Sequence, residues 1–483
     1  MQLLVIQRIL GLLLIVFSST LLPPIVVGLS YGDGAVMPFV ESIAVFLMFG
    51  FLLYLPVRNQ KKELRLRDGF LVVVLFWTVL GVASGLPIYL SGIYDISITD
   101  SIFESISGLT TTGATVIVGI DRLPHSLLIY RQELQWLGGM GIIVLAVAVL
   151  PMLGVGGMQL FRAETPGPVK NNKLTPRITE TAKALWYIYL GLTISCALAY
   201  WLAGMSGFDA VSHSFSTVAI GGFSTHDASI GYFNNTGIQL IAIVFMLLSG
   251  VNFAIHFIAI RNRSLKPYQR DAEFRTYIGV LLAVSVVTIG YLQLNHTFDS
   301  TTDSIIEGLF HVVSIGTTTG FTTAEYYSWP GFLPVLLIYV SFIGGCAGST
   351  GGGIKVIRIL LLVKQGAREL KRLIHPNAQI VVKIGKKLLP ENVIEAVWGF
   401  FAAYFAIFTL MILLLMATGL DQETAFSAVA ACLNNLGPGL GEVSQNFASI
   451  NDPAKWILCL AMLLGRLEIF TLLVLFTPAF WRK

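Results

Sequence analysis

The chain has 483 residues, of which 55% are hydrophobic and only 12% are charged, and its formal net charge is +4. An average soluble domain carries roughly 25% charged residues, so soluble enzymes and nucleic-acid-binding proteins are largely excluded. The apolar residues fall in blocks of about 20, the length of a helix that crosses a bilayer. They do not alternate as in an outer-membrane β-barrel. The composition therefore predicts an all-α polytopic membrane protein.

Ten apolar segments are long enough to span a membrane. In chain order they lie near residues 3–28, 37–57, 69–91, 126–153, 182–204, 237–260, 274–294, 329–363, 392–419 and 455–480. The first is too long an apolar run for a signal peptide and lacks a small-residue cleavage site, so we expect it to be retained as a span. Four shorter semi-polar segments, near 98–112, 208–221, 303–319 and 422–436, are too short to cross.

Lysine and arginine gather in alternate loops. They are dense in residues 58–67, 162–183, 261–275 and 358–387 and in the C-terminal tail, and sparse in the other loops. The positive-inside rule places these basic loops and both termini in the cytoplasm, and the four short segments on the outer side. Segment 358–387 could also hold an acidic partner or the head groups of anionic membrane lipids.

The short segments repeat along the chain. Each lies between two long spans and ends at a glycine: Gly113, Gly222, Gly320 and Gly437, separated by 109, 98 and 117 residues. Thirteen residues before the first three glycines lie Asp100, Asp209 and Glu307, and nine residues before them lie Glu104, His213 and His311. We expect two extra N-terminal helices in 1–67 and four span–pore-helix–span repeats in 68–160, 161–265, 266–388 and 389–483.

The ends of the four short segments are the candidate ion-binding residues. They read TTTGAT from Thr110, AIGGFS from Ala219, TTTGFT from Thr317 and NNLGPGLG from Asn434. Glycine permits positive φ angles, and irregular backbone at membrane depth is tolerated only where it lines a cavity or is buried in protein. Four such strands around one axis would offer rings of carbonyl oxygens to a dehydrated monovalent cation. One TTTG alone is more often a turn, but four such segment ends, each with a glycine and at near-equal spacing, predict a selectivity filter around a central pore.

This plan resembles the Trk/Ktr/HKT superfamily of potassium transporters, and its two extra spans and filter wording resemble the potassium uptake proteins of the bacterial Trk system. The resemblance implies potassium uptake across the bacterial inner membrane. It also implies a pore within one subunit, a homodimer, and a cytoplasmic nucleotide-binding regulatory subunit, TrkA. The implied potassium-binding carbonyls are those of Thr111, Thr112, Ile220, Gly221, Thr318, Thr319, Asn435 and Leu436, anchored by the four glycines. The second and fourth units lack the threonine triplet, so the ring cannot be fourfold symmetric.

Segment 344–353 has six glycines in ten residues inside an apolar span. Because each glycine costs ~1 kcal/mol in a helix relative to alanine, we expect a broken helix here. Two interpretations remain: a close helix crossing that needs small residues, or a gate under the pore, which the resemblance favours. The gate residues would be Gly344, Gly345, Gly348, Ser349, Thr350, Gly351, Gly352 and Gly353.

Arg466 is the only arginine deep within a full predicted span. A charge there costs at least ~2.5–3.5 kcal/mol, so its side chain should face the protein interior or a wet cavity. It could form an ion pair with an acid on another span, such as Glu133. Alternatively it is a fixed positive charge beside the pore, below the fourth filter strand, as the resemblance implies.

The sequence thus predicts potassium permeation, with potassium as the transported ligand, no organic cofactor and no enzymatic activity. A potassium–sodium or potassium–proton symporter on the same scaffold is the alternative within this class. A membrane-embedded redox or cofactor-binding subunit is the alternative outside it, and it would need paired histidine ligands on facing spans. The histidines show no such spacing.

Overall fold

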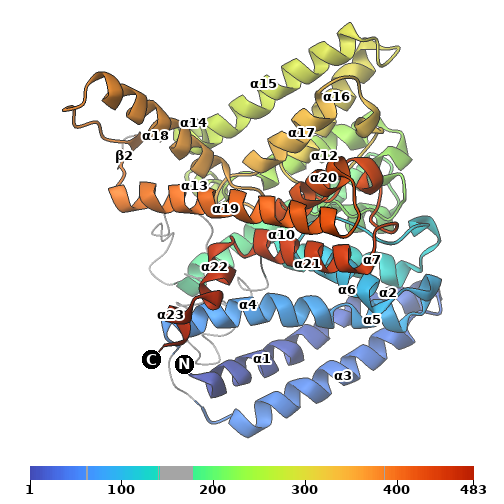
Figure 1. Ribbon diagram of the computed structural model, residues 1–483. Helices are drawn as coiled ribbons and strands as arrows, with labels where there is room; N and C mark the ends of the chain where they lie inside the picture. Colours follow the sequence, from blue (N-terminus) through green and yellow to red (C-terminus); the bar gives the residue numbers. More distant parts are fainter. Residues whose placement is uncertain (61–63, 140, 142–177, 386, 483) are drawn as a thin grey trace.

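A computed structural model describes residues 1–60, 64–139, 141, 178–385 and 387–482 (Figure 1). The first half holds α1 (Leu3–Ser18), α2 (Leu22–Tyr31), α3 (Met37–Tyr54), α4 (Leu66–Ala83), α5 (Leu86–Leu90), α6 (Ile98–Leu109), α7 (His125–Gly139), α10 (Ile178–Leu202) and α11 (Gly207–Ala219). Then follow α12 (Thr236–Ser249), α13 (Phe253–Asn262), α14 (Lys266–Arg270), α15 (Ala272–Leu294), α16 (Thr301–Gly316), α17 (Leu333–Ile343) and α18 (Val356–Ile374). The last part holds α19 (Glu391–Ala417), α20 (Gln422–Leu433), α21 (Asp452–Arg466), α22 (Phe470–Leu473) and α23 (Pro478–Trp481).

The described chain is helical apart from one small strand pair. Strands β1 (Lys383–Ile384) and β2 (Lys387–Leu388) pair antiparallel, with Lys383 opposite Leu388. They lie between α18 and α19, at one end of the molecule (Figure 1). The expected all-α membrane fold is therefore confirmed.

Among the described residues, six helices are long and apolar enough to cross a membrane, or eight if each of two bent pairs counts as one span. The six lie at Leu3–Tyr31, Met37–Val57, Arg67–Leu90, Lys183–Leu202, Ala272–Leu294 and Glu391–Ala417. Most of the second half of the predicted span 126–153 lies outside the described residues. The total of ten spans stays a prediction.

Two of the predicted spans are sharply bent. The pair α12 and α13 bends by 95°, and α21 bends by 106° against the turns that follow it. In the first, the side chain of Asn252 caps the new helix by accepting a hydrogen bond from Ala254 N. In the second, Glu468 and Ile469 both have positive φ angles, 54° and 48°, which no α-helix continues through. Hydropathy alone does not reveal such breaks, because the residues on both sides remain apolar.

A third predicted span, 329–363, is interrupted by the glycine-rich segment. Helix α17 ends at Ile343 and α18 begins at Val356. Between them Gly344, Gly348 and Gly353 have φ angles of 65°, 76° and 75°, which only glycine adopts readily. The backbone therefore crosses this stretch as a loop and not as a helix.

Four short helices occupy the predicted semi-polar segments. They are α6, α11, α16 and α20, and each begins at a residue whose side chain accepts a backbone N–H: Ser97, Ser206, Ser300 and Asp421. Such caps satisfy donors that the first helical turn leaves unpaired. The C-terminal halves of these helices are almost entirely buried, so their ends lie inside the protein.

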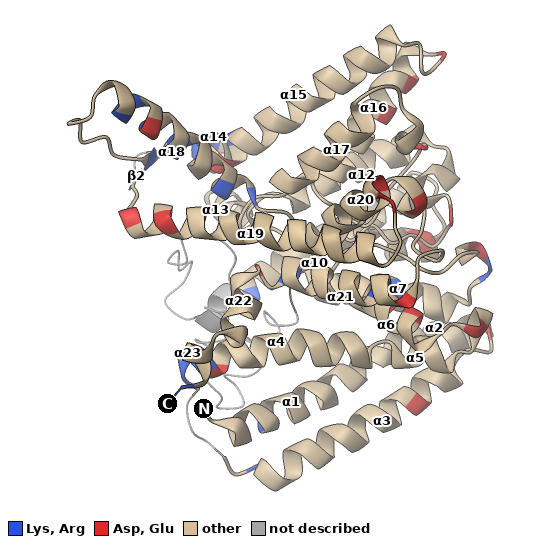
Figure 2. Ribbon diagram, viewed as in Figure 1, with Lys and Arg blue, Asp and Glu red and all other residues tan. Residues whose placement is uncertain are grey.

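Both termini lie at one end of the molecule. The N–H of Gln2 donates to Asp68 Oδ1 (3.0 Å), and Arg67 donates to the carbonyl of Arg482 (2.6 Å). Figure 2 shows basic residues of α18, α14 and the C-terminal tail at this end, whereas many acidic residues lie at the opposite end. This polarity agrees with the charge distribution of the sequence.

Candidate functional site

The loops that follow the four short helices share one backbone pattern. In each, the N–H of the residue before the anchoring glycine donates to a carbonyl five residues earlier. These bonds join Thr112 to Ser107 (2.8 Å), Gly221 to Ser216 (2.9 Å), Thr319 to Ser314 (2.7 Å) and Leu436 to Ala431 (2.7 Å). The helix ends are therefore closed in the same way four times.

Two positions of each loop have positive φ. The anchoring glycines Gly113, Gly222, Gly320 and Gly437 have φ angles of 81°, 81°, 85° and 97°. Two residues earlier, Thr111, Ile220, Thr318 and Asn435 have φ angles of 56°, 54°, 71° and 54°. For threonine and isoleucine this is a genuine outlier, because a β-branched side chain crowds the left-handed backbone. The sequence predicted the glycines, but nothing in it predicted the second position.

The four glycines close a ring. A Cβ atom added to Gly113 would meet the carbonyl oxygen of Gly221, one on Gly222 that of Thr319, one on Gly320 that of Leu436, and one on Gly437 that of Thr112. Each loop therefore packs against the next in chain order, and the fourth packs against the first. The four loops therefore form a closed ring, the arrangement that a filter requires.

The loops differ in how their side chains are held. In the first and third, threonine hydroxyls bond each other: Thr110 with Thr112 (2.8 Å) and Thr317 with Thr319 (2.7 Å). In the fourth, the Asn435 amide donates to Thr112 Oγ1 (2.9 Å) and so ties this loop to the first. Position by position, the ring is not fourfold symmetric.

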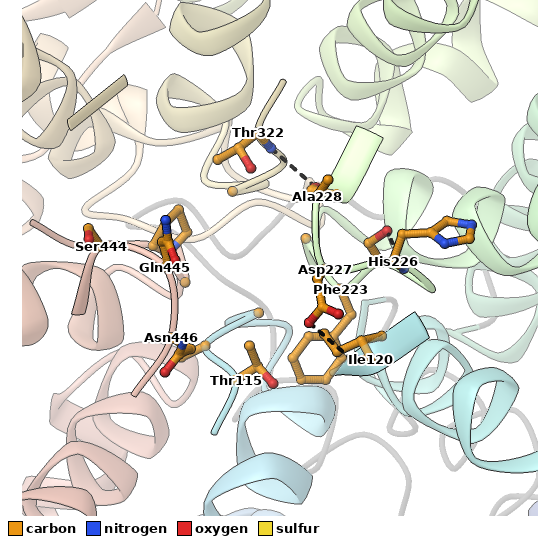
Figure 3. A pocket seen from close by; sticks show the side chains of 18 of the residues that line it. Thr115, Ile120, Phe223, His226, Asp227, Ala228, Thr322, Ser444, Gln445 and Asn446 are labelled. Carbon is orange, nitrogen blue, oxygen red and sulfur yellow. Dashed lines mark hydrogen bonds between the residues drawn. The ribbon is translucent and has the colours of Figure 1, made fainter. Parts of the chain in front are cut away.

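A cavity of about 590 Å³ lies on the side of this ring that the sequence predicts to face outward, and we call it the outer cavity. All four anchoring glycines line it, and so do side chains from all four outer loops, among them Thr115, His226, Thr322 and Asn446 (Figure 3). The cavity therefore opens directly onto the ring.

His226 joins the first two outer loops. Its Nδ1 lies 2.6 Å from Asp121 Oδ1, its Nε2 lies 3.5 Å from Asp209 Oδ1, and its ring stacks on Tyr232. Burial alone would lower the pKa of His226, but the neighbouring carboxylates of Asp209 and Asp121 outweigh it, so the pKa is raised. Burial opposes ionisation of Asp121, but its hydrogen bonds to His226 and Asp227 hold its pKa below the ordinary value. The cluster therefore links the first two loops at the rim of the cavity.

The glycine-rich loop 344–353 contacts the inner ends of the short helices. Its hydrogen bonds run from Gly352 N to Thr318 Oγ1 (2.7 Å), from Gly353 N to Asn434 O (3.0 Å) and from Thr350 Oγ1 to Val218 O (3.0 Å). Val218, Thr318 and Asn434 belong to the ends of α11, α16 and α20 and the turns that follow them. The loop therefore lies against three of the four helix ends, on the side away from the outer cavity.

Arg466 binds this loop. Its guanidinium donates to the carbonyls of Thr350 (3.3 Å) and Gly139 (3.2 Å) and to that of Gly138. No ion pair with Glu133 is present among the described residues. Lys355, which is buried, donates to the carbonyl of Gly351. Two basic side chains thus contact the loop, the partly buried Arg466 and the buried Lys355, and sequence reasoning identified only Arg466.

Sequence reasoning also missed the polar face of α7. Arg131, which is fully buried, pairs with Glu104 (2.8 Å), and Gln135 contacts the second filter loop at Gly221. The signal was present, because polar side chains inside an apolar span are costly and usually functional. Among the described residues, no group of three or more His, Cys, Asp or Glu could hold a metal ion.

Comparison with known proteins agrees with this geometry. A family model described as "TrkH: Cation transport protein" matches residues 35–483. The chain is 60% identical over 485 residues to the "Trk system potassium uptake protein TrkH" of Vibrio parahaemolyticus, covering 100% of both chains. It is 59% identical over 478 residues to the protein of that name from Escherichia coli, covering 99% of both.

A solved structure shares the whole fold. The crystal structure of the potassium transporter TrkH from Vibrio parahaemolyticus has a TM-score of 0.91 and 58% sequence identity, covering 100% of both chains. Family model, sequence and structure all agree over nearly the full length. The chain belongs to the TrkH family of cation transport proteins.

Proposed function

We propose that this protein takes up potassium across the bacterial inner membrane, through a pore formed by the four glycine loops. The closed ring of Gly113, Gly222, Gly320 and Gly437, each against a carbonyl of the next loop, is the observation that carries the proposal. The names of its full-length relatives, potassium uptake proteins of the Trk system, support the choice of ion. The protein acts as a transporter and not as an enzyme.

The ion leaves its hydration shell in the outer cavity and binds backbone oxygens in the ring. The proposed ligands are the carbonyls of Thr111, Thr112, Ile220, Gly221, Thr318, Thr319, Asn435 and Leu436. The short helices end at the ring with their C-termini, where the helix dipole favours a cation. No side-chain charge is needed for selectivity, since the spacing and field of the carbonyls set it.

The glycine-rich loop 344–353 is the proposed gate. Its contacts with Thr318 and Asn434 place it against the inner ends of the filter helices, where it would block an ion leaving the ring. Arg466 holds the loop through Thr350 and adds a positive charge. A fixed charge there opposes a cation by ~4 kcal/mol at 4 Å for an effective dielectric constant of ~20.

Control from the cytoplasm would act through α18, which begins three residues after the loop and carries Lys364, Lys371 and Arg372 outside its buried face. These basic residues suit an acidic surface on a regulatory subunit, TrkA, or anionic lipid head groups. The assembly is a homodimer with all termini in the cytoplasm. The four repeats 68–160, 161–265, 266–388 and 389–483 surround one pore in each subunit.

The test is ion flux into liposomes that contain the purified protein alone, with potassium, rubidium, sodium and lithium compared. We expect potassium and rubidium to enter and sodium and lithium to be excluded. Equal entry of sodium and potassium would contradict the filter. Uphill potassium accumulation that requires an imposed sodium or proton gradient would instead support the symporter.

A further inference from the structure

The buried side chain of Gln135, on α7, makes three hydrogen bonds to the second repeat. Its Nε2 donates to the carbonyl of Gly221 (2.6 Å), and its Oε1 accepts from Ser216 Oγ (2.7 Å) and Phe223 N (3.1 Å). Gly221 and Phe223 flank the anchoring glycine of the second loop. One amide therefore contacts the loop on both sides of that glycine.

The second loop has no polar side chain of its own at these positions. Where the first and third loops carry threonine triplets and the fourth carries two asparagines, the second reads Ala219-Ile220-Gly221. The internal hydroxyl pairs of the threonine loops are Thr110–Thr112 and Thr317–Thr319. Gln135, on a helix of the first repeat, supplies the polar side chain that the second loop lacks.

Space around Gly221 fits this arrangement. A Cβ atom on Gly221 would overlap the Gln135 side chain, whose own Cβ lies 2.9 Å from that position. Any side chain at Gly221 would therefore displace the amide. The glycine at position 221, where the first and third loops have threonine, thus leaves the space that the Gln135 amide fills.

A second side chain of α7 extends the contact. Arg131, four residues before Gln135 and so on the same helix face, donates to the carbonyl of Ser224 (3.2 Å) and lies over the ring of Phe223 (4.2 Å). Together Arg131 and Gln135 hold residues 221–224, the part of the second loop that faces the outer cavity. This helix belongs to the first repeat, so the second loop is held by its neighbour.

We propose that Gln135 is a positioning residue that sets ion selectivity at the second quarter of the filter. Its N–H fixes the oxygen of Gly221 and keeps that carbonyl from moving toward a smaller ion. Without the donor, the carbonyl could approach sodium, and discrimination between sodium and potassium would fall. The inference rests on the proposed function, since it assigns a role within that filter.

The experiment compares Gln135→Met with Gln132→Met in liposomes and measures the ratio of potassium to sodium flux. Methionine keeps the length of the side chain and removes donor and acceptor together. Gln132 is a matched control: it is on the same helix and fully buried, and neither of its side-chain polar atoms has a hydrogen-bond partner among the described residues. The ratio does not depend on how much protein is active.

We expect Gln135→Met to lower the ratio roughly two- to twelvefold, the range set by the net strength of one hydrogen bond. Gln132→Met should leave it unchanged. Ser216→Ala, which removes the hydroxyl that orients the amide, should shift the ratio in the same direction by less. If Gln135→Met does not accumulate as folded protein, the flux ratios of Gln135→Glu and Ser216→Ala test the proposal instead. A fall in their potassium-to-sodium ratio supports it, and an unchanged ratio contradicts it.

An unchanged ratio in Gln135→Met, or an equal fall in Gln132→Met, would overturn the proposal. Failure of the proposed function gives a different result, because wild-type protein would then show no preference for potassium. A wild type that prefers potassium, with variants that match it, would contradict only the role of Gln135.

Discussion

The filter ring and the glycine-rich loop beneath it are built from the same residue type but held in opposite ways. In the ring, one hydrogen bond of 2.7–2.9 Å recurs at all four helix ends, and each loop packs against the next. In loop 344–353 the contacts do not repeat: Ala347 N donates to the side chain of Glu273, Gly352 N to that of Thr318, and Gly353 N to the carbonyl of Asn434. Glycine therefore serves one repeated backbone closure in the ring, and in the loop it serves a set of different contacts that each occur once.

Breaking the ring should have the largest effect. Gly113→Ser or Gly320→Ser adds a Cβ that meets the carbonyl of Gly221 or Leu436, on a backbone that costs ~1–2 kcal/mol more for any L-residue. We expect flux to be abolished or sodium to be admitted. The measurement is the potassium-to-sodium flux ratio in liposomes.

The control for the ring is Gly290→Ser, on α15, where an added Cβ meets nothing within 4 Å. It should behave as wild type. Wild-type selectivity in either ring variant would contradict the assignment of these loops as the filter.

Shortening the glycine-rich loop 344–353 tests whether it is a gate. Deletion of residues 351–353 removes the contacts of Gly352 with Thr318 and of Gly353 with Asn434. We expect severalfold more potassium flux per folded protein and weaker control by a cytoplasmic partner. If the loop only packs helices, flux per folded protein will be unchanged or lower, and expression will fall.

Arg466 both binds the glycine-rich loop and carries a positive charge, and two substitutions separate these roles. Arg466→Ala should raise flux by removing a positive charge and the bonds to Thr350 and Gly139. Arg466→Lys keeps the charge and should remain near wild type if charge is the barrier. Loss of flux or of folded protein in Arg466→Ala would show instead that the arginine is structural.

The smallest effect is expected at the outer rim. The pKa of His226 is raised by Asp209 and Asp121, so its charged pairs stabilise the fold fully below its ordinary pKa of 6.5 and are lost as pH rises through the raised value. The melting temperature of wild type should therefore exceed that of His226→Phe most at low pH. The difference should shrink by at most a few degrees as pH rises, since partly exposed pairs contribute little. A difference that stays constant across this range would rule out the charged pairing.

Much of the site follows from local sequence. The four glycines, the short helices before them and the break at 344–353 are all marked by residue type, because glycine and helix caps act within a few residues. The left-handed backbone at Ile220 is not marked in this way. It belongs to the closure of α11, where the N–H of Gly221 bonds to the carbonyl of Ser216, and no propensity of isoleucine favours it.

The contacts between repeats could not be predicted from the sequence, because the residues that meet are far apart along the chain. Gln135 and Gly221 are 86 residues apart, and Arg466 and Gly138 are 328 apart. A single sequence shows that Gln135 is polar within an apolar span, but not which loop it meets. The bends between Ser249 and Phe253 and between Arg466 and Phe470 were likewise hidden, because apolar helices continue on both sides of them.

The ring is made by one chain and not by four copies, which has a genetic consequence. In an assembly of identical subunits, one codon change alters every quarter of a symmetric ring at once. Here each quarter has its own codons, so a substitution at Ile220 changes the sequence of one quarter alone. Such a ring can be altered in small steps, and a neighbour such as Gln135 can contribute a polar group where one quarter has none.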